Sequence, residues 1–340
     1  MNIYEQQKSN RRKTALIIVI FVIFLGFLGF GFDYFYLGYD PWRPPRPSNF
    51  PLDASFPFPL ATIVVIGLAC YWSLWSLYGG DSAVLASADA VRIYPGTPDP
   101  QRQMLLNIVH EMAIAAGLPM PKVHIIPDSD PNAFATGRDP QHASIAVTQG
   151  LLDKLNREEL QAVVGHEMSH VRNFDIRLMT VIAALVGAAV LLSDWTRRAM
   201  WSGGGRGGRR SARTGRGGGG FGLIVLVLWV VTWLLAPLLA RILAMAVSRQ
   251  REYLADASSA ELTRNPAALA SALKKIESDF NPTRSIKQGT AHLCIADPLG
   301  RKMGLREGVL PDLFATHPPM YHRISKLMQM SYQAPNSLSA

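Results

Sequence analysis

The 340-residue sequence predicts an α+β fold that is mainly helical, is anchored in a membrane by up to four transmembrane runs, and has a small β-sheet beside a central helix. Two observations carry this prediction. Hydrophobic residues make up 49% of the chain and gather in long uncharged runs, as in segments that lie in lipid. Between the second and third runs, short β-rich stretches bounded by turn residues alternate with longer stretches of helical periodicity.

The central helix is predicted over Asn156 to Asp175 from its own chemistry. Asn156 can cap the first free backbone N–H groups, and Glu159 can reach back to complete a capping box. Apolar residues then recur at helical spacing and form one stripe: Leu160, Val163, Val164, Met168 and Val171. We therefore expect an amphipathic helix with one buried face.

Three residues on this helix indicate a metal site. His166 and His170 are four positions apart, so both imidazoles lie on one face and can bind a single ion. Glu167 projects about 100° away on the helical wheel, as expected of a base that acts on a metal-bound water. The alternative is a surface helix with two solvated His residues, which the capped amphipathic context disfavours.

The first two apolar runs predict a transmembrane hairpin. Thr14 to Phe32 follows four basic residues, is about 19 residues long and lacks a small-residue cleavage site, which favours an anchor over a signal peptide. Asp33 and the tyrosines after it predict an interfacial end for this run. Leu60 to Tyr78 forms the second run, and its last residues include aromatic side chains that suit a membrane interface, namely Trp72, Trp75 and Tyr78.

A second pair of apolar runs flanks a basic loop. Leu178 to Leu192 is marginal for a span, whereas Phe221 to Val247 is long enough despite Pro237 and Arg241. Residues 196–220 hold seven Arg and no acid, and without these seven the net charge of +9 falls to +2. Glycine-rich Arg loops beside apolar runs favour a connector attracted to lipid headgroups. Because no nucleic-acid motif accompanies the loop, we expect no nucleic-acid partner.

The remaining segments predict the small sheet and three further helices. Asp99-Pro100 starts a helix that ends at Gly117, with a buried stripe of Met104, Leu105, Ile108, Met112 and Ile114. Strands are predicted over Lys122 to Ile126, Ala143 to Thr148 and His292 to Ala296. Helices are predicted after Asn265-Pro266 and near Arg323 to Met330.

A catalytic zinc usually takes three protein ligands, so two His residues require a third from elsewhere. Glu252 is the candidate, because it lies on a predicted helix with Asp256 one turn further on. Asp256 could hold a ligating His by its other ring nitrogen. Spacing alone does not distinguish this metal-site interpretation from a second one. In the second, Glu252 and Asp256 form the polar face of a helix that leaves the membrane.

Four separated motifs favour the first interpretation. They are Asn132–Gly137 (NAFATG), Gly165–His170 (GHEMSH), Arg251–Ala257 (REYLADA) and Thr316–Ile324 (THPPMYHRI). Together, and in this order, they resemble the HtpX family of membrane-embedded zinc metalloproteases. The resemblance covers nearly the whole chain. It departs from the family's pattern at Met320, Tyr321 and His322, where the family tends to carry acidic residues, and in the Arg/Gly-rich loop.

The resemblance implies a role for each motif. His166, His170 and Glu252 would bind one zinc ion per chain, Glu167 would be the general base, and Asp256 would support a ligating His. Asn132, Ala133, Phe134 and Ala135 would form a strand beside which an extended substrate lies, because a strand edge recognises peptide backbone. His317 or Arg323 would stabilise the oxyanion.

The implied protein is a membrane-bound zinc metalloendopeptidase that cleaves misfolded or damaged membrane proteins. Its partners would be protein or peptide substrates and the lipid bilayer. The implied domains are a transmembrane hairpin (1–80), the first half of a protease domain (81–177), a second apolar hairpin (178–247) and the second half (248–340). The alternatives are a CAAX prenyl protease, which has more membrane runs, and a membrane scaffold with a structural zinc, which would not need Glu167.

The predicted location is a bacterial inner membrane, crossed several times. Glu252 must meet His166 and His170, so the two runs between them cross the membrane twice or dip into it without crossing. Basic residues flank the predicted spans evenly on both sides, so the positive-inside rule does not decide the orientation. The resemblance implies an active site that faces the cytoplasm.

Overall fold

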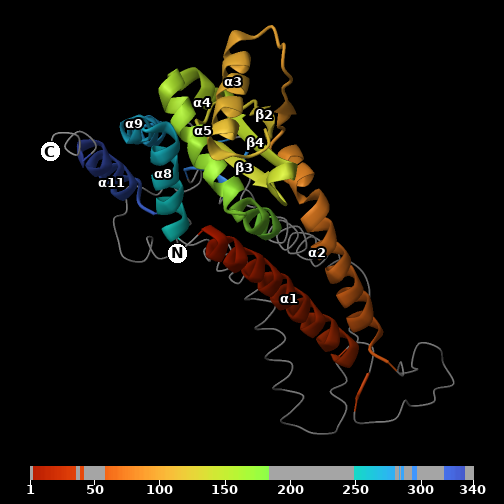
Figure 1. Cartoon of the computed structure of the whole chain (residues 1–340). Helices are drawn as coiled ribbons and strands as arrows, with labels where there is room; N and C mark the ends of the chain where they lie inside the picture. The colour runs from red at the N-terminus through yellow and green to blue at the C-terminus, as the bar shows by residue number, and fades with distance from the viewer. Residues whose placement is uncertain are drawn as a thin grey trace. The chain divides into compact units, whose positions relative to one another are not determined.

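The computed structural model describes residues 3–35, 39–41, 58–183, 249–279, 283, 285–286, 293–296 and 318–333 (Figure 1). The chain divides into two compact units. One comprises Met1–Thr14, Ser76–Gly187 and Ile242–Ala340, and the other comprises Ala15–Trp75 and Ala188–Arg241. The predicted second apolar hairpin lies almost wholly outside the described residues, so it and the predicted domain boundaries stay predictions.

Two long helices carry the first two apolar runs. Helix α1 spans Ile3–Phe35 and α2 spans Leu60–Ser87, and both are long and apolar enough to cross a membrane. Large apolar side chains are exposed along both, such as Ile23 at 65%, which suits contact with lipid. Asp33 does more than end the first run. It is fully buried and accepts hydrogen bonds from the backbone N–H groups of Ala61 and Thr62, so it caps the start of α2.

Four strands form one sheet in the order β1-β2-β4-β3. The predicted strands β2 (Lys122–Ile126) and β4 (Ala143–Thr148) are confirmed and pair in parallel at the centre. Strand β3 (Ala133–Gly137) pairs antiparallel with β4 and forms one edge. Strand β1 (Val91–Arg92) pairs antiparallel with β2 at the other edge, and its two residues are too few to give a sequence pattern.

Helix α3 (Pro100–Ala116) has the predicted caps. The Asp99 side chain accepts hydrogen bonds from two backbone N–H groups of the first turn, and Gly117 ends the helix at φ 66. The predicted stripe is correct for Leu105, Ile108 and Met112 but wrong for Ile114, which is 69% exposed. Two positions separate Ile114 from Met112, so the helix turns it to the opposite face.

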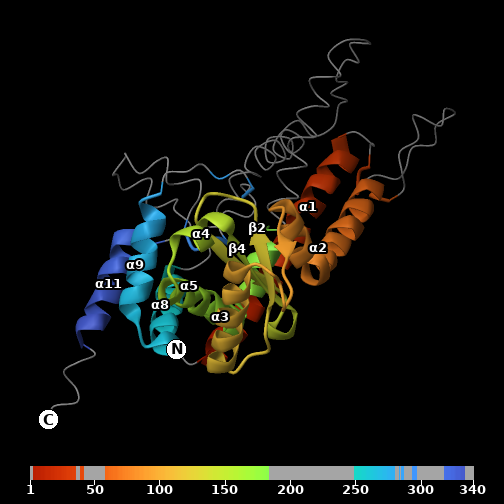
Figure 2. The same cartoon turned by 90° about the horizontal axis from the view of Figure 1, so that it is seen from above.

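The central helix α5 (Arg157–Arg172) is confirmed with both bonds of its capping box, and every residue of its predicted apolar stripe is buried. It ends three residues before the predicted Asp175. Phe174 has φ 58, and helical backbone resumes over 175–183 after this turn. Helix α4 (Gln149–Lys154), capped by Thr148, leads into α5. The sides of α5 contact α3, β3, α8 and α9, so this helix is the centre of its unit (Figure 2).

Three helices complete the described part of this unit. These are α8 (Arg249–Thr263), α9 (Pro266–Glu277), which has the predicted cap at Asn265, and α11 (Met320–Gln333). Helices α9 and α11 lie side by side (Figures 1 and 2). The strand predicted over His292 to Ala296 is wrong for the described residues 293–296, which form a short 3-10 turn and bends. One backbone bond, from Ile295 N–H to the Ala133 carbonyl, still joins this segment to the edge of β3.

Candidate metal centre

Close packing of α5 against α8 brings the predicted ligands together. The Ser259 hydroxyl donates to the Ala162 carbonyl at 2.6 Å, which ties one helix to the backbone of the other. Gly165 faces the same contact, and a Cβ there would lie 3.2 Å from Ser259 Oγ. A small residue at this position lets the helices approach. Glu252, in the first turn of α8, therefore lies beside the His residues of α5.

The three predicted ligands converge in the interior. His166, His170 and Glu252 each offer one ligand atom, and these three atoms lie within 4.8 Å of one another. The two Nε2 atoms are 3.2 Å apart, and each lies 3.6 Å from one Glu252 oxygen. All three side chains are buried, with the residues between 0% and 4% exposed. The predicted long-range contact between α5 and Glu252 is thus present.

A carboxylate lies behind each His. Asp256 Oδ1 is 3.0 Å from Nδ1 of His166, as predicted for Asp256. Asp175 Oδ2 is 3.1 Å from Nδ1 of His170. Each carboxylate can fix its imidazole so that Nε2 faces the other ligands. The sequence prediction assigned no role to Asp175, although a carboxylate five residues after a ligating His was a possible signal.

Arg323 is fully buried and completes the support of His166. Its guanidinium binds Asp256 in a bidentate manner, with Nε–Oδ2 at 2.8 Å and Nη2–Oδ1 at 2.7 Å. Its Nη1 donates to the Ile295 carbonyl at 2.8 Å. All three nitrogen atoms thus have partners, which favours a structural role. The predicted oxyanion role of Arg323 stays a prediction, and the predicted His317 lies outside the described residues.

The carboxylates set the charge state of the metal-free site. Burial alone would lower the pKa of His166, but the Asp256 and Glu252 carboxylates raise it to about 9. Burial alone would raise the pKa of Asp256, but the Arg323 guanidinium lowers it to about 2. His166 is therefore protonated at neutral pH in the metal-free chain, so a metal ion must displace that proton.

Glu167 lies beside the ligands and has the character of a base. It is 1% exposed, and its Oε2 has no hydrogen-bond partner among the described residues. Burial raises its pKa above the ordinary value, while the nearby His residues and a backbone hydrogen bond from Ala135 act in the opposite direction. A buried carboxylate with a raised pKa and an unused oxygen can accept a proton from a water molecule at the site.

The outer edge of β3 runs past Glu167. Asn132 bonds through its carbonyl to Thr148 of β4, so the alternation of the antiparallel ladder turns Ala133, Ala135 and Gly137 outward. The Ala133 carbonyl is taken by Ile295, and Gly137 N–H donates to the Thr180 hydroxyl at 3.1 Å. Among the described residues, no backbone segment pairs with the outer side of Ala135, whose N–H donates to the Glu167 carboxylate.

The donor set fits a zinc ion. Two imidazole nitrogens and one carboxylate oxygen are the ligands of one known type of catalytic zinc site, which keeps a fourth position for water. The three donors face one another in a buried space, and each His has the carboxylate partner that zinc ligands usually have. A carboxylate that is not itself a ligand, Glu167, stands next to them.

This fold and this donor set define a metallopeptidase of the HExxH type. The sequence profile of Peptidase family M48 matches residues 100–331. A protein named "Protease HtpX homolog" from Thermoanaerobacter pseudethanolicus is 42% identical over 97% of this chain and 98% of its own length. Another protein of that name, from Streptococcus gordonii, is 37% identical over 96% of this chain and 100% of its own length.

The chain belongs to Peptidase family M48 and is an HtpX-type member, as its sequence motifs predicted. A solved structure was also similar. The crystal structure of S. mikatae Ste24p aligns with a TM-score of 0.44 and 18% identity, over 79% of this chain and 58% of that one.

Proposed function

We propose that this protein is a membrane-bound endopeptidase with one zinc ion per chain, and that it cleaves misfolded or damaged membrane proteins. The convergence of His166, His170 and Glu252 beside Glu167 carries the proposal. Zinc suits this N,N,O donor set. The name shared by the relatives, "Protease HtpX homolog", favours an endopeptidase over a CAAX prenyl protease or a scaffold.

The chemistry divides between the ion and the side chains. When bound, zinc supplies a Lewis acid that lowers the pKa of water and polarises the scissile carbonyl. Glu167 takes the proton of the attacking water and passes it to the leaving amine. Its raised pKa suits this exchange, because a carboxylate with a higher pKa holds a proton more readily. Asp256 and Asp175 keep the His imidazoles in the orientation that ligation needs.

Substrate would lie extended along the edge of β3. Backbone groups of this strand can pair with any peptide irrespective of its side chains, which suits an enzyme with many substrates. The Ala135 rung is the natural pairing point because it is next to Glu167. Asn132, Ala133 and Phe134 would instead shape the edge. The Asn132 amide donates to the Ala296 carbonyl at 2.9 Å, and the Phe134 side chain is fully buried.

Two observations support a membrane location. Helices α1 and α2 are long and apolar enough to cross a bilayer, and their apolar side chains are exposed. The relatives named above come from bacteria, so the membrane would be the bacterial inner membrane. We place the active site on the cytoplasmic side. Protease added outside sealed cells should then cleave the Arg/Gly-rich loop of residues 196–220 if the flanking runs cross fully, and protection of that loop would favour a hairpin that only dips into the bilayer.

The replacement Glu167→Gln tests the enzymatic proposal. We expect the purified full-length variant to retain one zinc ion per chain and to lose at least 100-fold in the cleavage of casein or an unfolded membrane protein, in line with the ~10²–10⁴ that general bases contribute. Glu261→Gln, on the exposed side of α8, is the matched control and should behave as wild type. Undiminished cleavage by Glu167→Gln would overturn the proposal.

A further inference from the structure

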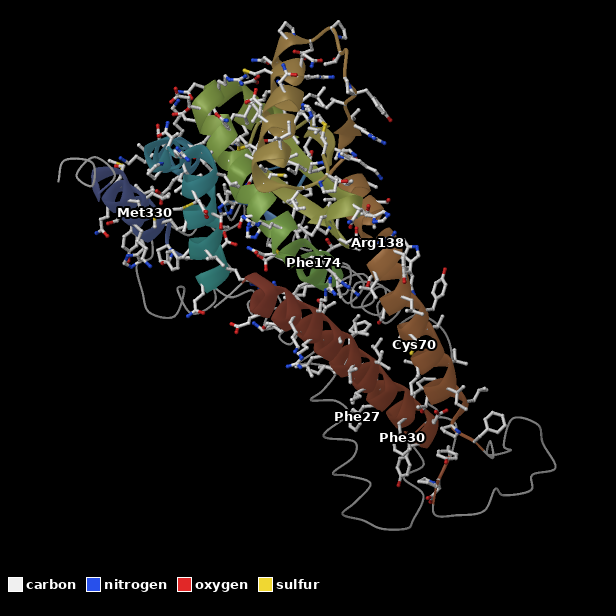
Figure 3. The ribbon with its side chains drawn as sticks, viewed as in Figure 1. Phe27, Phe30, Cys70, Arg138, Phe174 and Met330 are labelled. Carbon is white, nitrogen blue, oxygen red and sulfur yellow. The ribbon has the colours of Figure 1, made fainter. Side chains whose placement is uncertain are left out.

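The first turns of α1 reach the back of the metal centre. Asn10, which is 2% exposed, donates through Nδ2 to Asp175 Oδ1 at 2.6 Å and to the Asn173 carbonyl at 3.0 Å. The two ends of this contact lie 165 residues apart in the chain. Phe174, labelled in Figure 3, lies just past the end of α5, and the Arg11 guanidinium carbon stands 4.6 Å from the centre of its ring. Helix α1 therefore contacts the turn that follows the metal-binding helix at two adjacent positions.

Asp175 connects Asn10 to a candidate ligand. Its Oδ2 lies 3.1 Å from Nδ1 of His170, while its Oδ1 receives Asn10 and lies 3.5 Å from Nη1 of Arg251. One oxygen of the Asp175 carboxylate thus contacts His170, and the other contacts Asn10. A carboxylate turns readily about its last side-chain bond unless both oxygens are held. Oδ1 is the oxygen that faces away from His170. Asn10 restrains it more strongly than Arg251 does, because the Asn10 contact is shorter.

The environment requires an amide at position 10. The turn at Phe174 leaves the Asn173 carbonyl in the interior, where an unpaired acceptor would be costly. One amide nitrogen has two hydrogens, so Asn10 can satisfy that carbonyl and Asp175 together. Neighbouring Thr14, also buried, bonds only to the Asn10 carbonyl of its own helix among the described residues.

We propose that Asn10 is a positioning residue of the metal centre, acting through Asp175 on His170, and that it makes metal affinity depend on the docking of the membrane helix α1. The inference rests on the proposed function, because it takes His170 to be a zinc ligand. Displacement of the first turns of α1 would release Asp175, let the His170 ring turn and weaken the site. The first turns of α1 would then support the metal centre.

The test measures metal binding by the full-length protein in detergent or nanodiscs, and so does not depend on activity. Asn10→Leu removes the donor at similar volume, and Asn10→Ala does so without adding bulk. We expect either variant to bind zinc on the order of tenfold more weakly in competition with a chromophoric chelator, at the lower end of the ~10–100-fold typical of residues that orient metal ligands. The d–d absorption spectrum of the Co²⁺-substituted variants should also change. Thr14→Val, the matched control, should keep the affinity within twofold and leave the spectrum unaltered.

A double-mutant cycle separates positioning from general destabilisation. If Asn10 acts through Asp175, then Asn10→Leu should weaken zinc binding in the wild-type background and have no further effect in Asp175→Asn. Variants at position 10 that lower the thermal stability of the metal-free protein but bind zinc as tightly as wild type would overturn the inference. His170→Ala distinguishes this failure from failure of the proposed function, since equal zinc affinity of His170→Ala and wild type would refute His170 as a ligand.

Discussion

Replacing Arg323 by Leu should lower the free energy of unfolding, because the buried Asp256 carboxylate behind His166 then loses the guanidinium that pairs with it. The guanidinium makes two charged hydrogen bonds to Asp256, at 2.8 and 2.7 Å, and one to the Ile295 carbonyl. All of Arg323 is buried, and Asp256 is 3% exposed, so water cannot replace these bonds. Among the described residues, the variant leaves the buried Asp256 carboxylate with His166 as its remaining partner.

Two routes give the size of the effect. Removing one partner of a buried ion pair costs about 3–5 kcal/mol of unfolding free energy. Burial alone would raise the pKa of Asp256, but Arg323 and His166 together lower it from 3.8 to about 2, so the shift corresponds to roughly 2 kcal/mol from the ionisation of Asp256. Since this pKa is depressed in the folded state, the stabilisation is present above pH 3.8 and is lost as the pH falls through about 2. We therefore expect a loss of about 3–5 kcal/mol at pH 7.

Urea unfolding in detergent, followed by circular dichroism with a chelator present, measures this loss without the contribution of a metal. Lys326→Leu is the control on the same helix, because Lys326 is exposed and contacts only the Tyr253 ring among the described residues, which is worth less than about 1 kcal/mol. Replacing Arg323 and Asp256 together by Leu should recover part of the loss, since Asp256 is then not left buried without its cation. Equal stability of Arg323→Leu and Lys326→Leu would refute the reasoning.

Three further predictions concern other parts of the same unit. Glu159→Gln should cost about 1–3 kcal/mol at pH 7, because the charged hydrogen bond from Lys275 is lost. Burial alone raises the pKa of Glu159 but Lys275 and its other donors lower it below 4.5, so metal-free unfolding curves of variant and wild type should converge as the pH falls below about 4. Gly150→Ala should destabilise by about 1–3 kcal/mol in the same assay, because its Cβ would overlap the Ser129 carbonyl oxygen; an unchanged midpoint would contradict this. Zinc at 100 times its Kd should stabilise the metal-free protein by about 2.7 kcal/mol, and His170→Ala should abolish that gain in thermal scans.

Local chemistry made much of the fold predictable from the sequence. Helix starts at Asp99, Asn156 and Asn265 follow from side chains that cap the backbone within three or four residues. The two central strands follow from short apolar runs between turn residues. The His pair and Glu167 follow from one helical turn, so their relation was fixed once α5 was predicted. All of these signals span only a few residues.

Long-range pairing explains what the sequence did not predict. Nothing near Asp175 indicates that its second oxygen bonds Asn10, because the two meet only after folding. The stripe predicted for α3 includes Ile114, whereas the packing of α3 decides which face is covered and leaves Ile114 exposed. The segment predicted as a strand at 293–296 follows the edge of β3 for one bond and then bends, and its partners there, Asn132 and Arg323, come from elsewhere in the chain.

The narrowness of the β3 edge has a consequence for which chains can be cut. Among the described residues, Ile295 and Thr180 occupy the edge on either side of Ala135, so in the proposed mode of binding an incoming peptide would pair at Ala135 alone. A segment held in a stable helix offers no free backbone there and must first open. Cleavage then follows the equilibrium population of the open form, and every ~1.4 kcal/mol of local stability in the substrate slows it about tenfold. Under the proposed function, the same protein would then be spared when correctly assembled and cut when partly unfolded, without any recognition sequence that distinguishes the two states.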